Sequence, residues 1–156
     1  MKPRFDKIKQ TYQDTHAFPR EVLYQELGWG DLVNNPAYEN TCAVRISLAL
    51  IKLGITLPGR LMIKAGPHKG KMIEPGQAKL SHLLARPTLL GAPEKCKMVD
   101  VHKMIGNRRG IIAFFKIPTY GNGGHIDLIA PDRGGVHVCA SACYWNASEV
   151  WFWPLP

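Results

Sequence analysis

The sequence has no apolar run long enough to cross a lipid bilayer. The longest runs, such as IIAFF at residues 111–115, fall far short of the roughly 20 residues that a transmembrane helix needs. The charged opening MKPRFDKIKQTYQDTH is not followed by an apolar stretch, so no cleavable secretory signal is predicted. We expect one domain over residues 1–156 that does not insert into membranes. It either acts in the cytoplasm or leaves by a route that needs no cleavable leader.

Cysteine is scarce, and its spacing does not suit a metal site. The chain has four cysteines and no CxxC pair among them, which argues against structural zinc. Cys139 and Cys143, in the segment CASAC, are close enough to bridge across a turn, whereas Cys42 is far from both. Disulfides belong to oxidising compartments. We predict no metal and no other cofactor.

Acidic residues are outnumbered: 12 Asp and Glu stand against 20 Lys and Arg, which gives a formal net charge of +8. This charge suits a polyanionic partner, such as nucleic acid, an acidic cell-wall polymer or a membrane surface. The basic residues are scattered along the chain, Arg45 among them, and most are expected on a solvated surface. The sequence lacks an arginine-rich helix or an alternation of aromatic and basic residues, which disfavours nucleic-acid binding.

The clearest helix in the sequence lies in the segment NTCAVRISLALI, residues 40–51. Either Asn40 or Thr41 can cap it, and Gly54 ends it. Its apolar face consists of Ala43, Ile46, Leu50 and Leu53. Cys42 therefore lies in the first turn.

The remaining pattern places helices before strands. Further helices are expected within residues 1–30, over 77–86 and over 94–105, with an irregular loop carrying short extended pieces over 55–76. Strands are expected over 110–117, 124–130 and 134–140, and residues 148–155 form a short aromatic strand or an edge segment. This order predicts an α+β fold in which a helix layer packs on one face of an antiparallel sheet.

Cys42 has a position that favours a thiolate. Backbone N–H groups at a helix N-terminus and the helix dipole stabilise negative charge there, and the same N–H groups can bind an oxyanion. Cysteine is also among the most frequently buried residues, so an inert core cysteine is the competing interpretation.

His125 is the best candidate for a base, because it follows the flexible run GNGG and opens a strand. Its orienting partner is open. His137 is expected on the next strand, beside His125, whereas Asp127 lies two residues on and shares the face of His125. Asp132, in the turn between these strands, is a third alternative. All of these could also be ordinary strand or surface residues, so the residues alone leave a Cys–His hydrolase undecided.

The segments NTCAVRISLAL, GNGGHIDLI and CYWNASEVWFWPL together resemble the fourth family of type VI secretion amidase effectors, and more distantly the NlpC-type cell-wall peptidases. The resemblance runs from roughly residue 15 to the C-terminus. It implies a papain-like core, with Cys42 as nucleophile and His125 as general base. The implied substrate is the peptidoglycan peptide stem, cut between D-glutamate and meso-diaminopimelate.

For the third member of the site, the resemblance points in two directions. NlpC-like enzymes carry a histidine on the following strand, which selects His137, whereas the effector family more often uses an aspartate. We assign the role to His137 and keep Asp127 and Asp132 as alternatives.

The resemblance also implies partners and a place of action. Such effectors are delivered by the type VI secretion machinery without a signal peptide, and they act in the periplasm of a competing bacterium. A Cys139–Cys143 disulfide could form there. A cognate immunity protein that covers the Cys42 cleft is expected. The alternatives are a papain-like transglutaminase or deamidase with another amide substrate, and a basic nucleic-acid-binding domain.

Overall fold

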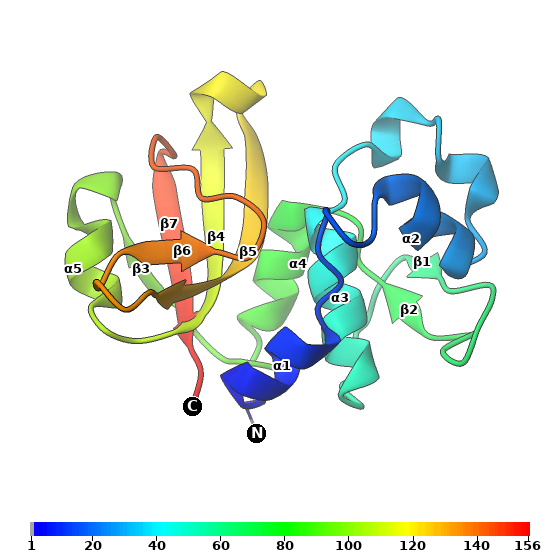
Figure 1. Cartoon of the computed structure of the whole chain (residues 1–156), viewed down its shortest axis with the longest axis horizontal. Coiled ribbons are helices and arrows are strands. Elements are labelled where there is room, and N and C mark those ends of the chain that lie inside the picture. Colours follow the sequence, from blue (N-terminus) through cyan, green and yellow to red (C-terminus); the bar gives the residue numbers. More distant parts are fainter. Residues whose placement is uncertain (1) are drawn as a thin grey trace.

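A five-stranded antiparallel sheet forms one side of the molecule (Figure 1). The computed structural model describes residues 2–156. The strands run in the order β3-β7-β4-β5-β6. Their bounds are β3 (Glu94–Cys96), β4 (Gly110–Ile117), β5 (Gly123–Pro131), β6 (His137–Cys139) and β7 (Glu149–Pro154). A separate hairpin of β1 (Leu61–Met62) and β2 (Met72–Ile73) supplies the short extended pieces expected in the loop. The predicted α+β class is confirmed.

Helices precede most of the strands in the chain, as predicted. They are α1 (Phe5–Thr11), α2 (Arg20–Glu26), α3 (Cys42–Lys52), α4 (Gln77–Leu84) and α5 (Val101–Ile105), with 3-10 turns at Gly30–Leu32, Pro36–Tyr38, Met98–Asp100 and Pro118–Tyr120. Helices α3 and α4 lie between the sheet and the N-terminal part, as Figure 1 shows. None of the helices in residues 2–156 has the length and apolar character needed to span a membrane.

Both faces of the sheet are covered, which corrects the prediction of helices on one face only. On one face, Ile111, Ile126 and Trp153 join the core around α3 and α4. On the other face, Ile112 and Phe152 join a second core that includes α5. Figure 1 shows α5 on the opposite side of the sheet from α3 and α4. Alternate residues of β4 and β7 supply the two cores, because successive side chains of a strand point to opposite faces.

The structure decides one open prediction and overturns another. For residues 148–155 the sequence allows a strand or an edge segment; the strand alternative is confirmed, and β7 lies inside the sheet, between β3 and β4. The helix predicted over 94–105 is wrong in its first half, because β3 pairs with β7 from Glu94 to Cys96 and the helix begins only at Val101. Pairing with an aromatic strand outweighs the local helical pattern here.

The predicted helix over Cys42 is confirmed, and every residue from Cys42 to Ile51 is buried. It is therefore a central helix that is packed on all sides, whereas the sequence predicts a helix with a single apolar face. Of the two predicted caps, Asn40 acts: its Oδ1 accepts a hydrogen bond of 3.1 Å from the Cys42 N–H. The Asn40 Nδ2 donates to the carbonyl of Gly124 at 3.2 Å. This side chain thus ties the start of α3 to the residue before His125.

Candidate active site

A small pocket of about 170 Å³ opens at the N-terminal end of α3. It brings together four separate segments: the chain after α1, the start of α3, the start of β5 and the chain after β6. Its lining residues include Tyr12, Asn40, Cys42, His125 and Tyr144. Cys42 is 5% exposed and lines this pocket.

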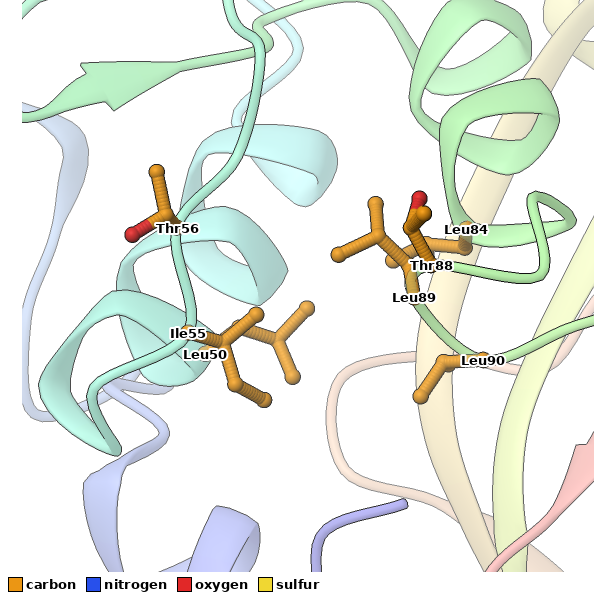
Figure 2. Close-up of a pocket in the computed structure, with 7 residues that line it drawn as sticks. All are labelled: Leu50, Ile55, Thr56, Leu84, Thr88, Leu89 and Leu90. Atoms are coloured by element: carbon orange, nitrogen blue, oxygen red, sulfur yellow. The ribbon is translucent and has the colours of Figure 1, made fainter. Parts of the chain in front are cut away.

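A larger pocket lies at the other end of α3, and its chemistry differs. It measures about 320 Å³ and is lined by leucine, isoleucine and threonine. Figure 2 shows Leu50, Ile55 and Thr56 facing Leu84 and its neighbours across it. Its lining holds no acid, base or thiol, and Leu50 is about 12 Å from Cys42 along the helix axis. The reactive groups therefore meet in the smaller pocket.

His125 and Asp127 form a buried pair on β5. The His125 Nε2 lies 2.7 Å from Asp127 Oδ2, and the two residues are 6% and 0% exposed. They share a face of the strand because they are two residues apart. Phe114 stacks beside the imidazole with ring centroids 6.3 Å apart, and Tyr144 meets it edge-on at 5.1 Å. Since Nε2 faces Asp127, Nδ1 is the ring nitrogen that is left to form a hydrogen bond with Cys42.

Backbone groups hold Asp127 in place from two sides. Its Oδ1 accepts from the N–H of Leu128 at 2.8 Å, and its Oδ2 accepts from Ser141 at 3.1 Å and Ala142 at 3.0 Å. Ser141 and Ala142 lie inside the loop that the Cys139–Cys143 disulfide closes. The bridge that the sequence allowed therefore forms next to the site. A carboxylate with this many N–H donors is held in one orientation.

His125 is a cation at neutral pH. Burial alone lowers the pKa of the imidazole, but the hydrogen bonds to Asp127 and Cys42 and the charges of these two groups outweigh it and raise the pKa to about 9. A positive imidazole beside a helix-start thiol favours the thiolate, which is the reactive form of cysteine. The pocket therefore places the Cys42 side chain next to a positively charged imidazole.

The raised pKa of His125 predicts a loss of stability at alkaline pH. The pKa is 6.5 for an ordinary histidine and about 9 in the fold. Because the folded pKa is higher, the stabilisation is complete below pH 6.5 and is lost as the pH rises through 9. It amounts to on the order of 3 kcal/mol.

Urea unfolding on either side of this pH window measures the effect. The free energy of unfolding of the wild type should fall between the two conditions, and that of Asp127→Asn should fall less, because this variant lacks the carboxylate that raises the pKa. An equal fall in both proteins would contradict the assigned pair.

His137 does not lie beside His125, so the predicted juxtaposition is wrong. Strand β6 pairs only with the last residues of β5, and His137 is in register with Pro131. Extending this register places residue 143 opposite His125. The His137 Nδ1 lies 2.7 Å from the Nδ1 of His102, and its Nε2 lies 2.7 Å from the carbonyl oxygen of Gly106.

Asp132 is also remote from the imidazole. Its Oδ1 accepts hydrogen bonds from the N–H groups of Gly134 and Val136, which close the turn before β6. Of the three partners considered for His125, Asp127 is the one in contact with it.

The sequence does not predict the role of Arg45, because a scattered basic residue is expected on the solvated surface. Arg45 is 2% exposed and lies one turn after Cys42. Its Nε donates to Thr41 Oγ1, and its Nη1 donates to the carbonyls of Gln13 and Phe18, each at 2.8 Å. It thereby fixes the segment after α1 against the pocket. A single basic residue inside the apolar run CAVRISLAL is the sequence signal that could indicate a buried arginine.

Within residues 2–156, no group of three or more His, Cys, Asp or Glu side chains is arranged to hold a metal ion. The two cysteines outside the disulfide in this part of the chain are Cys42, in the pocket, and Cys96, on β3.

Comparison with known proteins gives one family. The model of the type VI secretion system amidase effector protein 4 family, Tae4, matches residues 38–153. No curated protein matches the sequence.

Solved structures with the same fold include proteins from two bacteria, Salmonella typhimurium and Enterobacter cloacae. The effector Tae4 from Salmonella typhimurium, in complex with the immunity Tai4 from Enterobacter cloacae, has a TM-score of 0.74 at 17% identity over 99% of each chain. The effector Tae4 from Enterobacter cloacae has a TM-score of 0.71 at 20% identity, covering 100% of this chain and 98% of that one. A chain of the Enterobacter cloacae Tae4–Tai4 complex has a TM-score of 0.70 at 19% identity, and the match covers 100% of this chain and 100% of that one.

Proposed function

The chain belongs to the type VI secretion amidase effector protein 4 family, and we propose that Cys42, His125 and Asp127 carry out its amide hydrolysis. The observation that carries this proposal is the 2.7 Å contact between His125 and Asp127, buried in the pocket that also holds Cys42. A nucleophile, a base and an oriented acceptor are the three parts that thiol-based acyl transfer requires.

Each of the three residues has a defined task in the reaction. The Cys42 thiolate attacks the scissile carbonyl carbon, and the carbonyl electron pair moves to oxygen. As the tetrahedral intermediate collapses, the His125 imidazolium gives its proton to the leaving amine. His125 then takes a proton from water as the water oxygen attacks the thioester carbonyl carbon. The carbon–sulfur bond breaks, the Cys42 thiolate leaves, and the carboxylate product is released. Asp127 keeps the ring oriented and stabilises its positive charge throughout.

The proposed substrate is the peptide stem of peptidoglycan in a competing bacterium. The cut bond is the amide between the γ-carboxyl of D-glutamate and meso-diaminopimelate, as in a DL-endopeptidase. Membership of an amidase effector family supports this choice, and the net charge of +8 suits an anionic wall. The Cys139–Cys143 disulfide suits an oxidising periplasm.

Two partners follow from the same membership. The type VI secretion machinery delivers the effector, so export needs no cleavable signal. A cognate immunity protein protects the producing cell, as in the solved relatives that are complexes of Tae4 with the immunity protein Tai4. In this chain, the immunity protein is proposed to cover the pocket that holds Cys42.

Mass spectrometry of purified sacculi digested by the wild-type protein tests the proposed bond. The expected products are one fragment that ends in D-glutamate and one with a free amine on meso-diaminopimelate. A related deamidase or transglutaminase would leave the stem in one piece. Products cut at another amide, or an uncut stem carrying a changed side chain, would contradict the proposal.

A further inference from the structure

Tyr12 carries a buried hydroxyl group without a hydrogen-bond partner among residues 2–156. Tyr12 lines the same pocket as Cys42 and His125. Buried polar groups are nearly always paired, so an unpaired one beside a reactive thiol needs an explanation. Tyr12 lies outside residues 38–153, which match the family model.

The position of Tyr12 is fixed by its neighbours in the chain. Its N–H donates to the Ile8 carbonyl at 3.0 Å, and the preceding residue, Thr11, donates from Oγ1 to the Ala49 carbonyl at 2.9 Å. The following residue, Gln13, is held by Arg45 through its carbonyl. Both sides of Tyr12 are thus tied to α3, so its ring is held against the pocket without any bond to its hydroxyl.

The pocket lacks one donor that a helix-start nucleophile ordinarily offers. The N–H of such a residue can bind the oxyanion of the tetrahedral intermediate. In this chain the Cys42 N–H already donates to Asn40 Oδ1. With this N–H engaged, a further donor in the pocket would strengthen the binding of an oxyanion formed on the carbonyl that Cys42 attacks.

We propose that the Tyr12 hydroxyl donates a hydrogen bond to the scissile carbonyl oxygen as it becomes an oxyanion. The inference rests on the proposed function, since it needs Cys42 as the nucleophile. When the sulfur–carbon bond forms, the carbonyl electron pair moves to oxygen, and Tyr12 stabilises that charge without transferring its proton. When the carbon–nitrogen bond breaks, the pair returns to the carbonyl, and the hydroxyl is free again.

The phenol is suited to this task because it stays neutral. Burial raises the pKa of Tyr12 far above its ordinary value, and the negative charges of Asp127 and Cys42 raise it further against the opposing effect of Arg45. The group therefore remains a donor at alkaline pH. A fixed donor in a site with little water needs no reorganisation when the oxyanion forms.

Tyr12→Phe removes the hydroxyl and tests the assignment. We expect kcat to fall about 10²- to 10³-fold with little change in KM, because the lost interaction exists mainly in the transition state. The Tm should stay the same or rise, since the variant loses a polar group that had no partner.

Tyr24→Phe is the matched control. Tyr24 is also buried, but its hydroxyl donates to the Tyr38 carbonyl at 2.7 Å, and it does not line the pocket. Its loss should lower the Tm by about 3 °C and leave kcat unchanged.

Alkylation by iodoacetamide separates the oxyanion role from an effect on the thiol. The Cys42 thiolate displaces iodide in this reaction, and no oxyanion forms. Tyr12→Phe should therefore be alkylated at Cys42 at the wild-type rate while it hydrolyses the stem slowly. Equal slowing of both reactions would mean that Tyr12 acts on the thiolate or on entry to the pocket, and would overturn the proposal.

Two other results would also overturn it. One is a wild-type kcat in Tyr12→Phe. The other is a Tm that falls by more than that of Tyr24→Phe, which would make the hydroxyl structural. Neither result affects the proposed function, which fails if the protein remains active without the Cys42 thiol or if it cuts a different bond.

Discussion

Cys42→Ala is expected to abolish hydrolysis of the peptidoglycan stem while leaving the fold intact. The side chain is the thiol of the pocket, and its removal leaves His125 and Asp127 without a nucleophile to activate. By analogy with other nucleophile deletions, kcat should fall by at least about 10⁴-fold. Alanine keeps the helix and leaves only a small space, so the free energy of unfolding should change by no more than about 1 kcal/mol. Release of soluble muropeptides and urea unfolding measure the two effects.

Cys96→Ala is the matched control for that variant. Cys96 is the other cysteine outside the disulfide; it lies on β3 opposite Val150 and does not line the pocket. Its variant should digest sacculi at the wild-type rate. Residual activity of Cys42→Ala above the background, or a large loss in Cys96→Ala, would show that Cys42 is not the nucleophile.

Asp127→Asn is expected to lower kcat by about 10³- to 10⁴-fold, because a neutral amide cannot stabilise the positive His125 ring. The pKa of His125 should fall from about 9, since Asp127 is the first of the groups that raise it. The amide N–H₂ group must replace either Oδ2, where it faces the imidazole and the N–H groups of Ser141 and Ala142, or Oδ1, where it faces the N–H of Leu128. Either arrangement leaves a buried donor unpaired, at a cost of about 1–3 kcal/mol in stability.

His137→Ala distinguishes Asp127 from the partner that the sequence favoured. His137 bonds to His102 and Gly106, so its loss should lower the Tm slightly and leave kcat unchanged. Rates of muropeptide hydrolysis and the pH of half-protonation of His125 by NMR measure both variants. A large loss of kcat in His137→Ala with a normal rate in Asp127→Asn would reverse the assignment.

The nucleophile helix and the long strands could be predicted from local pattern. Asn40, the apolar spacing behind Cys42 and Gly54 define α3, and continuous apolar runs define β4 and β5. These signals arise within a few residues, and the tertiary structure agrees with them. Residues 94–96 are the exception, because only pairing with β7 makes them a strand.

The orientation of His125 could not be predicted, because it depends on strand register. His137 follows His125 by a plausible hairpin distance, but the turn closed by Asp132 sets β6 opposite the far end of β5. A shift of a few residues along a strand decides which side chains meet. The contact between His125 and Asp127 does not depend on strand register, because the two residues lie two positions apart on the same strand. Asp127 is accordingly among the alternatives that the sequence offers.

Arg45 and Tyr12 illustrate a second limit. The surroundings of each side chain are formed by segments that are far apart in the sequence and meet only in the fold. Arg45 is buried because it binds the carbonyls of Gln13 and Phe18. The hydroxyl of Tyr12 is enclosed without a partner because its chain neighbours are fixed to α3. No local pattern carries this information.

Cys42 is proposed to attack the substrate and to carry its acyl group as a thioester. Acid quenching of the wild-type protein during hydrolysis of purified muropeptides, followed by peptide mapping with mass spectrometry, tests it most directly. We expect a thioester between Cys42 and the D-glutamyl fragment of the stem, which is absent from Cys42→Ala. An acyl adduct on any other residue, or full turnover by Cys42→Ala, would contradict it.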